Sequence, residues 1–247
     1  MPAGYRLAKL DSVDSTNAEA RRRADRGEPG PLWIWSSRQS KGRGRAGREW
    51  TSQFGNLFAS LLIRLNCPLP TASQLALVAG IVAYETVAKL IAYEAARSFC
   101  SNGRTTFSSP RRRSPACCSR TCPGPNPTAR SVVIGTGINL ANHPENLPQP
   151  AVSLAEYGLS VTPGEALQVL AATTHEWLMR WGEGATFPTI RRAWLDRAGP
   201  VGRPMRVKLN GVETEGTYAG LDSDGALRLR TSEGEARVTA GDVFFAN

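Results

Sequence analysis

The sequence predicts an α+β domain followed by a small β-barrel, because its hydrophobic pattern changes period along the chain. In the first part, a buried strand pattern at 57–63 is followed by a long helical pattern at 71–92. After residue 200 the apolar segments are short and alternating, with turn signals such as Asn210-Gly211 between them. We therefore predict two domains, at 1–199 and 200–247.

Local signals place the individual elements. The turn Asp14-Ser15-Thr16-Asn17 supplies N-cap side chains for a first helix. Thr162-Pro163-Gly164-Glu165 combines an N-cap, an N1 proline and a capping-box glutamate, and Gly199-Pro200 ends the last helix. The expected order is strand 5–10, helix 18–26, strands 33–36 and 57–63, helix 71–92, strand 131–135, helices from 163 and 190, then strands 205–209, 213–219, 226–230 and 235–238.

The positive charge of the chain is concentrated in one segment. The 247 residues carry a net charge of +9, and six arginines with no acidic residue lie between residues 101 and 130. Removing these six leaves only +3 for the rest of the chain. A nucleic-acid-binding surface would also interleave aromatic side chains, so we expect no DNA partner.

Composition also limits the location of the protein and its metal chemistry. The most apolar stretch, 75–91, contains Glu85 and Lys89, which argues against a membrane span. The N-terminus lacks the apolar core of a signal peptide. Five cysteines, an odd number, argue against a disulfide framework, and those near residue 120 lack a fourth metal ligand at suitable spacing. We expect a cytoplasmic protein, with no membrane contact and no metal ligand that can be named.

Residues 38–50 form the most informative loop. Its alternating glycines and arginines offer free backbone N–H groups and guanidinium forks, and both bind phosphate. The Gly-Lys-Ser/Thr ending of a Walker loop is absent. A flexible basic loop would show the same alternation, so the pattern alone leaves both interpretations open. Likewise, Ser15-Thr16-Asn17 alone indicates a helix cap.

Taken together, four ordered motifs resemble those of bacterial biotin protein ligases. They are Asp14-Ser15-Thr16-Asn17, then Gln39-x-x-Gly42-Arg43-Gly44-Arg45-x-Gly47-Arg48-x-Trp50, then Gly55-Asn56-Leu57, and Val133-Ile134-Gly135-Thr136-Gly137-Ile138-Asn139-Leu140. The resemblance covers about 5–95 and 131 to the end, where 220–227 is similar to the C-terminal barrel of the family. It implies a mixed sheet like that of class II synthetases, and then an SH3-like barrel.

The resemblance also implies an activity. Such ligases join biotin to ATP as biotinyl-adenylate, release pyrophosphate, and pass the biotinyl group to a lysine of a biotin carboxyl-carrier protein. ATP and biotin are therefore the expected small molecules, Mg²⁺ is expected from ATP chemistry, and a carboxyl-carrier domain is the expected partner. A homodimer is also compatible with the resemblance. Because only fourteen residues precede Ser15, the N-terminal helix-turn-helix of regulatory members is expected to be absent.

Residue roles follow from the same resemblance. Ser15, Thr16, Asn17 and Gln39 would hold the ureido ring and valeryl arm of biotin, because hydroxyl and amide groups complement ureido donors and acceptors. The loop would close over the adenylate and exclude water. In this loop, Arg43 and Arg45 are the expected catalytic charges, and they would bind biotin together with Gly44. The residues expected to order the loop are Gly42, Arg48 and Trp50. Asn139 would lie near the nucleotide.

The segment between residues 92 and 130 departs from the family pattern. A Lys-Trp-Pro-Asn-Asp motif and a Lys-x-x-Gly strand are missing, and all four lysines, at positions 9, 41, 89 and 208, lie elsewhere. Residues 101–130 contain no Leu, Ile, Val or Met, so they cannot supply central strands of a buried sheet. Without the lysine at the α-phosphate, we expect the literal chain to be weakly active or inactive.

We hypothesise that this segment is read out of frame. If residues 100–108 are encoded by TGC TCA AAT GGC CGA ACG ACG TTC TCC, the frame beginning at the third base reads Leu-Lys-Trp-Pro-Asn-Asp-Val-Leu. The same shift through residues 113–120 permits Lys-Pro-Gly-Leu-Leu-Leu-Glu, which lacks one residue before its glycine. A natural disordered insertion is the alternative.

Three other functions stay open at this point. A lipoate ligase would share the fold and the adenylation chemistry, although the Gly-Arg-Gly-Arg-x-Gly-Arg loop favours biotin. A catalytically impaired relative would bind biotin without forming an adenylate. A basic nucleic-acid-binding protein would need the charge around Arg113 to bind with a steep salt dependence.

Overall fold

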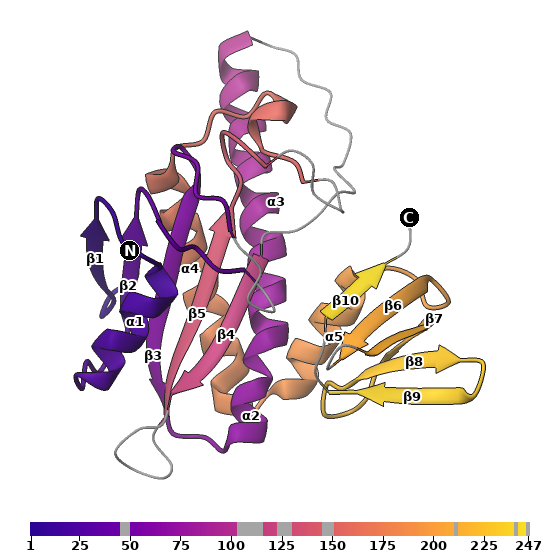
Figure 1. Ribbon diagram of the computed structural model, residues 1–247. Helices are drawn as coiled ribbons and strands as arrows, with labels where there is room; N and C mark the ends of the chain where they lie inside the picture. The colour runs from indigo at the N-terminus through magenta and orange to yellow at the C-terminus, as the bar shows by residue number, and fades with distance from the viewer. Residues whose placement is uncertain are drawn as a thin grey trace. The chain divides into compact units, whose positions relative to one another are not determined.

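The computed structural model describes residues 1–44, 50–102, 116–122, 130–144, 151–209, 212–239 and 242–245. Two compact units divide the chain, Met1–Met179 and Arg180–Asn247, and each contains one β-sheet (Figure 1).

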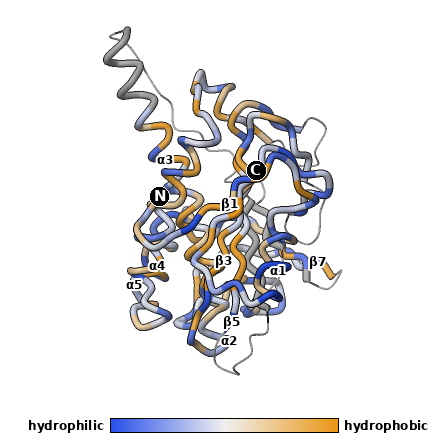
Figure 2. The backbone as a smooth tube through the Cα atoms, turned by 90° about the vertical axis from the view of Figure 1, so that its left-hand side faces the viewer, coloured by the Kyte–Doolittle hydropathy of each residue, from blue (hydrophilic) through white to orange (hydrophobic). Residues whose placement is uncertain are grey.

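A mixed five-stranded sheet forms the centre of the first unit. Its strands are β1 (Arg6–Leu10), β2 (Leu32–Ser36), β3 (Leu57–Leu65), β4 (Ala116–Cys122) and β5 (Arg130–Ile138), in the order β1-β2-β3-β5-β4. β1 and β2 are parallel, and the other neighbours are antiparallel. The predicted mixed sheet is therefore confirmed. The central strand β3 is predominantly hydrophobic along its length (Figure 2).

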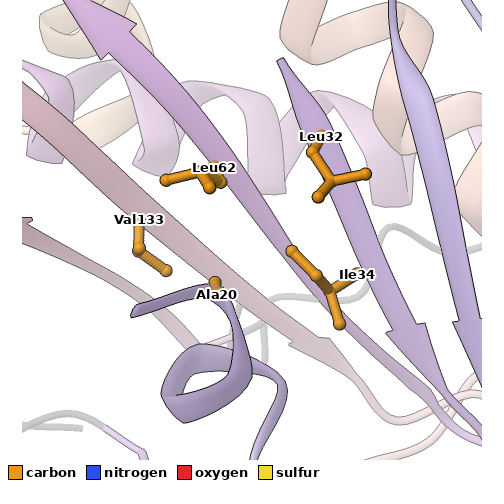
Figure 3. Close-up of a cluster of buried hydrophobic side chains, with 5 residues drawn as sticks. All are labelled: Ala20, Leu32, Ile34, Leu62 and Val133. Carbon is orange, nitrogen blue, oxygen red and sulfur yellow. The ribbon is translucent and has the colours of Figure 1, made fainter. Parts of the chain in front are cut away.

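Helices cover both faces of this sheet. α1 (Thr16–Asp25) lies on one face, and α3 (Leu75–Asn102) and α4 (Pro163–Trp181) lie on the other (Figure 1). Under α1, Ala20 packs on side chains from three neighbouring strands, which are Leu32, Ile34, Leu62 and Val133 (Figure 3). Because this cluster is fully buried, burial of apolar surface fixes α1 on the sheet.

Several predicted boundaries needed correction. α1 begins at Thr16, two residues before the predicted start. The long helix predicted at 71–92 is interrupted at Gln74, which separates α2 (Leu69–Ser73) from α3. The capping box at the start of α4 is confirmed, since Glu165 accepts hydrogen bonds from the backbone N–H (2.9 Å) and hydroxyl (2.7 Å) of Thr162.

Part of the anomalous segment does form a strand. Ala116–Cys122 pairs with β5 as β4, at the edge of the sheet and not at its centre. The backbone therefore keeps a place for a fifth strand, although the residues there are not those of a buried strand.

The charged residues of the stretch 75–91 argue against a membrane span, yet one segment of the described chain is long and apolar enough to cross a membrane. Leu69–Tyr93 meets this criterion by length and composition, and 44% of its most apolar window is buried within the protein. The core helix of a water-soluble protein meets the same criterion, so the finding is weak evidence for a membrane.

The second unit contains an antiparallel sheet in the order β10-β6-β7-β8-β9. The strands are β6 (Pro204–Leu209), β7 (Val212–Leu221), β8 (Leu227–Thr231), β9 (Gly234–Val238) and β10 (Asp242–Phe245). Helix α5 (Phe187–Ala198) joins it, since Arg191 Nε donates to the carbonyl of Asp222 at 2.7 Å and Trp194 meets Tyr218 edge to face. Short 3-10 turns, η2 (Ala155–Tyr157) and η3 (Gly182–Gly184), complete the regular elements.

Candidate functional site

A pocket opens on the first unit where α1 and β3 begin and β5 ends. It encloses about 350 Å³ of empty space, including the part open to solvent. Its wall comes from four segments that are distant in sequence: Thr16 and Asn17, then Gln39, Arg43, Gly44 and Trp50, then Phe58 and Ala59, and finally Gly135, Thr136 and Gly137.

Backbone pairing brings the first two of these segments together. Val13 and Gln39 form an isolated parallel bridge, in which the Val13 N–H donates to the Arg38 carbonyl and the Ser40 N–H donates to the Val13 carbonyl. The Lys41 N–H continues this contact by donating to the Asp14 carbonyl at 2.7 Å. The residues before α1 are therefore held beside the start of the loop 38–50, which we call the Arg-rich loop.

The Gln39 side chain is oriented by the start of α1. Its Oε1 accepts the backbone N–H of Thr16 at 2.8 Å and lies 3.2 Å from the Thr16 hydroxyl. Because a backbone N–H can only donate, Oε1 must be the acceptor, and the amide nitrogen then points to Ser52 Oγ at 3.2 Å. Gln39 also satisfies an otherwise free N–H of the first helical turn, at a helix start where the N-cap residue Ser15 makes no side-chain cap bond.

Ser60 extends this polar network into the sheet. Its hydroxyl is fully buried and lies 2.8 Å from both Thr16 Oγ1 and Asn17 Oδ1. A hydroxyl donates one proton and accepts others, so Ser60 links the two side chains in one chain of hydrogen bonds. Thr16, Asn17 and Gln39 are thereby fixed before any ligand binds.

Two glycines of β5 make room for the side chains of the pocket. Gly135 pairs with Ser60 in the β3–β5 register, and a Cβ at Gly135 would lie only 2.3 Å from the Asn17 amide. A Cβ at Gly137 would lie 2.8 Å from the Trp50 ring. Because neither approach leaves space for a methyl group, both positions require glycine.

Trp50 closes the Arg-rich loop. Its backbone N–H donates to the Gly42 carbonyl at 3.0 Å, and a Cβ on Gly42 would collide with the Trp50 carbonyl at 2.6 Å. The indole Nε1 is buried and, among the residues that the structure describes, has no hydrogen-bond partner. The two ends of the loop are thus pinned together, with Arg43 and Gly44 on the pocket side.

Asp14 anchors the turn from outside the pocket. Its carboxylate receives two hydrogen bonds from Arg22, at 2.7 and 2.8 Å, and one from the Ser15 N–H at 2.7 Å. Chiefly because of the Arg22 guanidinium, the pKa of Asp14 falls to about 2. The carboxylate is therefore ionised at neutral pH and holds the turn against the second turn of α1.

Sequence comparisons show which known proteins this chain resembles. The sequence model of the Biotin/lipoate A/B protein ligase family matches residues 10–116, and that of the Biotin protein ligase C terminal domain matches residues 201–246. The biotin--[acetyl-CoA-carboxylase] ligase of Paracoccus denitrificans is 34% identical, over 96% of this chain and 99% of the relative.

The chain belongs to the biotin protein ligase family.

Other relatives agree with this assignment. The bifunctional ligase/repressor of Bacillus subtilis is 28% identical over 97% of this chain and 74% of the relative. The structure of the biotin protein ligase from Aquifex aeolicus in complex with biotin and ATP superposes with a TM-score of 0.71. It covers 98% of this chain and 99% of that one, at 22% identity, so it shows the shared fold.

The structure of this ligase-family chain gathers many of the predicted site residues. Thr16, Asn17, Gln39, Arg43, Gly44 and Trp50 line one pocket, with Ser15 and Gly42 next to them in the chain. Asn139 does not line that pocket. It follows the end of β5, and its amide donates to the Val152 carbonyl at 3.3 Å. Arg45 and Arg48 lie outside the described residues.

The sequence did not identify the strand residues of the pocket as site residues. Phe58, Ala59 and Ser60 on β3, and Gly135, Thr136 and Gly137 on β5, all contact the pocket or its network. Ser60 was a usable signal, because a serine within the apolar run 57–63 needs a buried partner.

Proposed function

We propose that this protein is an ATP-dependent ligase that activates biotin as biotinyl-adenylate and transfers it to a lysine of a biotin carboxyl-carrier protein. The observation that carries the proposal is the prearranged Thr16–Gln39–Ser60 network beside a loop that contributes Arg43 and Gly44. The names of the relatives support it, since they include biotin--[acetyl-CoA-carboxylase] ligases and a structure holding biotin and ATP.

The polar end of the pocket suits the ureido ring of biotin. Thr16, Asn17 and Gln39 offer hydroxyl and amide groups, which complement a group with two N–H donors and one carbonyl acceptor. Phe58, Ala59 and Trp50 give the same pocket an apolar side for the rest of the bicyclic ring and the arm. Their fixed positions reduce the entropy that binding must overcome.

The Arg-rich loop suits the reacting groups. A carboxylate oxygen of biotin attacks the α-phosphorus of ATP, the bond between the α- and β-phosphates breaks, and pyrophosphate leaves. Arg43, and by our proposal Arg45, oppose the charge that develops on the phosphorus oxygens. In the second step the lysine amine attacks the acyl carbon, loses a proton and displaces AMP. Mg²⁺ would accompany ATP, with no protein ligand assigned.

The acceptor is proposed from chemistry and relatives. The Paracoccus denitrificans relative is named for acetyl-CoA carboxylase, so a carboxyl-carrier domain of such an enzyme is the partner that we propose. We also propose a cytoplasmic location, where ATP and carboxylases are found, and a homodimer that sedimentation equilibrium would test.

The activity of the literal chain depends on the anomalous segment. We propose that residues near 95–130 derive from a displaced reading frame, which a second set of codons also permits. If residues 112–120 are encoded by CGA AGG TCG CCG GCC TGC TGC TCG AGG, the frame that begins at the third base reads Lys-Val-Ala-Gly-Leu-Leu-Leu-Glu. That is a Lys-x-x-Gly motif with complete spacing, in the same frame as Lys-Trp-Pro-Asn-Asp.

The sheet gives independent support for this frame. β4 pairs with β5 along its length, and α3 lies against it. A strand with one neighbour in the sheet and a helix over it is expected to carry apolar residues. The displaced frame places three leucines in this strand, whereas the literal chain has Cys117, Cys118 and Ser119 there.

One experiment tests the proposed function and the frame together. Purified literal chain and a frame-restored version are incubated with biotin, Mg-ATP and a biotin carboxyl-carrier domain, and mass spectrometry measures biotin added to the target lysine. We expect transfer by the restored version and little or none by the literal chain. Equal transfer by both would refute the frame proposal. Absence of transfer by both, or incorporation of lipoate in place of biotin, would refute the proposed function.

A further inference from the structure

A single buried amide, Asn56, joins the start of β3 to the segment that follows β5. Its Oδ1 accepts three successive backbone N–H groups, those of Leu140 at 2.9 Å, Ala141 at 3.0 Å and Asn142 at 3.1 Å. Its Nδ2 donates to the Asn142 carbonyl at 2.8 Å. The side chain is only 2% exposed, so these bonds are shielded from water.

The position of Asn56 explains this geometry. Backbone pairing between β3 and β5 ends at Leu57 and Ile138. One residue further along, the Asn56 side chain replaces the backbone as the partner, and the chain after Ile138 turns away from the sheet. Three successive N–H groups converge on this one amide oxygen, which has only two lone pairs. Such convergence is the kind of concave backbone arrangement that also binds anions.

Gly55 allows the turn at 54–56 to approach the segment 140–142 closely. Its φ of +93° is a left-handed conformation that favours glycine, and a Cβ there would lie 2.9 Å from the Cβ of Ala141. The neighbouring Phe54 carbonyl accepts the side-chain amide of Asn142 at 2.9 Å. The turn 54–56 is therefore built to hold the segment 140–142, which we call the clamped segment.

The clamped segment follows a strand end that lines the candidate site, and it lines a second hollow itself. Gly137, three residues before it, lines the candidate site. Leu140 and Ala141 themselves line a second, open hollow together with Ala155, Gly158, Leu159, Ser160 and Val161. On the other side, the Leu140 carbonyl accepts the Ala155 N–H at 2.9 Å. Movement of the clamped segment would therefore change the wall of the second hollow and displace the residues directly after the strand that lines the candidate site.

We propose that Asn56 is a positioning residue for the nucleotide end of the active site. The inference rests on the proposed function, which requires a ligand in two parts, and on the family resemblance, which implies that Asn139, directly before the clamped segment, lies near the nucleotide. The biotin end has separate supports, namely Gln39 and Ser60. Loss of the Asn56 clamp should consequently weaken binding of a ligand with a nucleotide part while leaving biotin almost unaffected.

Hydrogen exchange tests the clamp without relying on activity. In the full chain, Asn56→Ala removes the shared acceptor, so exchange of the Leu140–Asn142 amides should rise by about tenfold or more, as expected for the loss of one to two kcal/mol of protection. Asn56→Asp keeps an oxygen for the three N–H groups but loses the amide that donates to the Asn142 carbonyl, so it should restore only part of the protection. The control Leu90→Ala weakens the buried core at α3 without touching the clamp.

Ligand binding then tests the positioning role. Calorimetry would compare the affinities for biotin and for a non-hydrolysable analogue of biotinyl-adenylate. For Asn56→Ala we expect the analogue to bind about tenfold more weakly and biotin to change less than about twofold. Leu90→Ala should not change the ratio of the two affinities.

The outcomes separate this inference from the proposed function. Unchanged exchange in Asn56→Ala, equal weakening of both ligands, or the same selective loss in Leu90→Ala would overturn the role of Asn56. If the parent chain binds neither biotin nor the analogue, the proposed function fails and the positioning role fails with it. The exchange data would then still decide whether Asn56 holds the clamped segment.

Discussion

β5 has two antiparallel partners whose sequences differ sharply. On one side, Phe58, Ala59 and Ser60 of β3 pair with Gly137, Thr136 and Gly135, and on the other side Ala116, Cys117 and Cys118 of β4 pair with the same three residues. β3 is buried at eight of its nine positions and serves the pocket. The fold therefore contains a strand on both sides of β5, but only β3 has the apolar sequence that a buried strand needs.

The largest expected effect comes from changing β4. Restoring the displaced frame through residues 95–130 would place leucines where Cys117, Cys118 and Ser119 now stand, in a strand that α3 lies against. We expect the free energy of unfolding to rise by several kcal/mol, since each buried leucine contributes about 2 kcal/mol. Denaturant unfolding of both chains would measure this. Equal stability would contradict our interpretation of β4.

A smaller loss is expected from Gly135→Ala on the β3 side. The added methyl group would lie 2.3 Å from the Asn17 amide, so either the amide or the strand must move, at a cost of about 1–3 kcal/mol. Biotin affinity should fall by about tenfold or more. Gly164→Ala is a matched control, because the nearest atom to its new methyl group is 4.0 Å away; unchanged biotin affinity in both variants would contradict the role of Gly135.

These positions show how far the sequence could be interpreted. The polar turn at 14–17 and the Arg-rich loop could be assigned to the site only together, through the family resemblance of the four motifs, because each pattern alone also fits a helix cap or a flexible basic loop. The glycines at 135 and 137 could not be assigned, since a glycine shows only that space is needed and not which side chain fills it. β4 was missed for a different reason: its residues carry no strand signal, and pairing with β5 decides their conformation.

Removing the Ser60 hydroxyl should have a further, smaller effect. Ser60→Ala removes the hydroxyl that meets Asn17 Oδ1 and one of the two side-chain partners of the Thr16 hydroxyl, and an unsatisfied polar group costs about 1–3 kcal/mol. Biotin binding, measured by calorimetry, should weaken by several-fold because the two side chains lose their fixed orientation. Ser131→Ala, at the other end of the β3–β5 pairing, should leave binding unchanged, and an equal effect there would point to general destabilisation.

The smallest expected effect is a pH dependence from Asp14. Its pKa is lowered to about 2 in the folded protein, mainly by the hydrogen bonds from Arg22, against about 3.9 in an unfolded chain. A lowered pKa stabilises the fold above the unfolded value, and this contribution is lost as the pH falls through the folded value. The melting temperature should therefore differ between the parent chain and Asp14→Asn by a constant amount from pH 8 to 5. The difference should shrink between pH 4 and 2, and a difference that grows in acid would contradict this assignment.

The most direct test of the central claim is the binding of biotin to the literal chain, because the β3 side of the pocket is complete without β4. Isothermal titration of the purified protein should show saturable binding of one biotin per chain, weakened in Gly135→Ala and retained in Gly164→Ala. A folded protein that binds no biotin, or binds it equally well in both variants, would contradict the account.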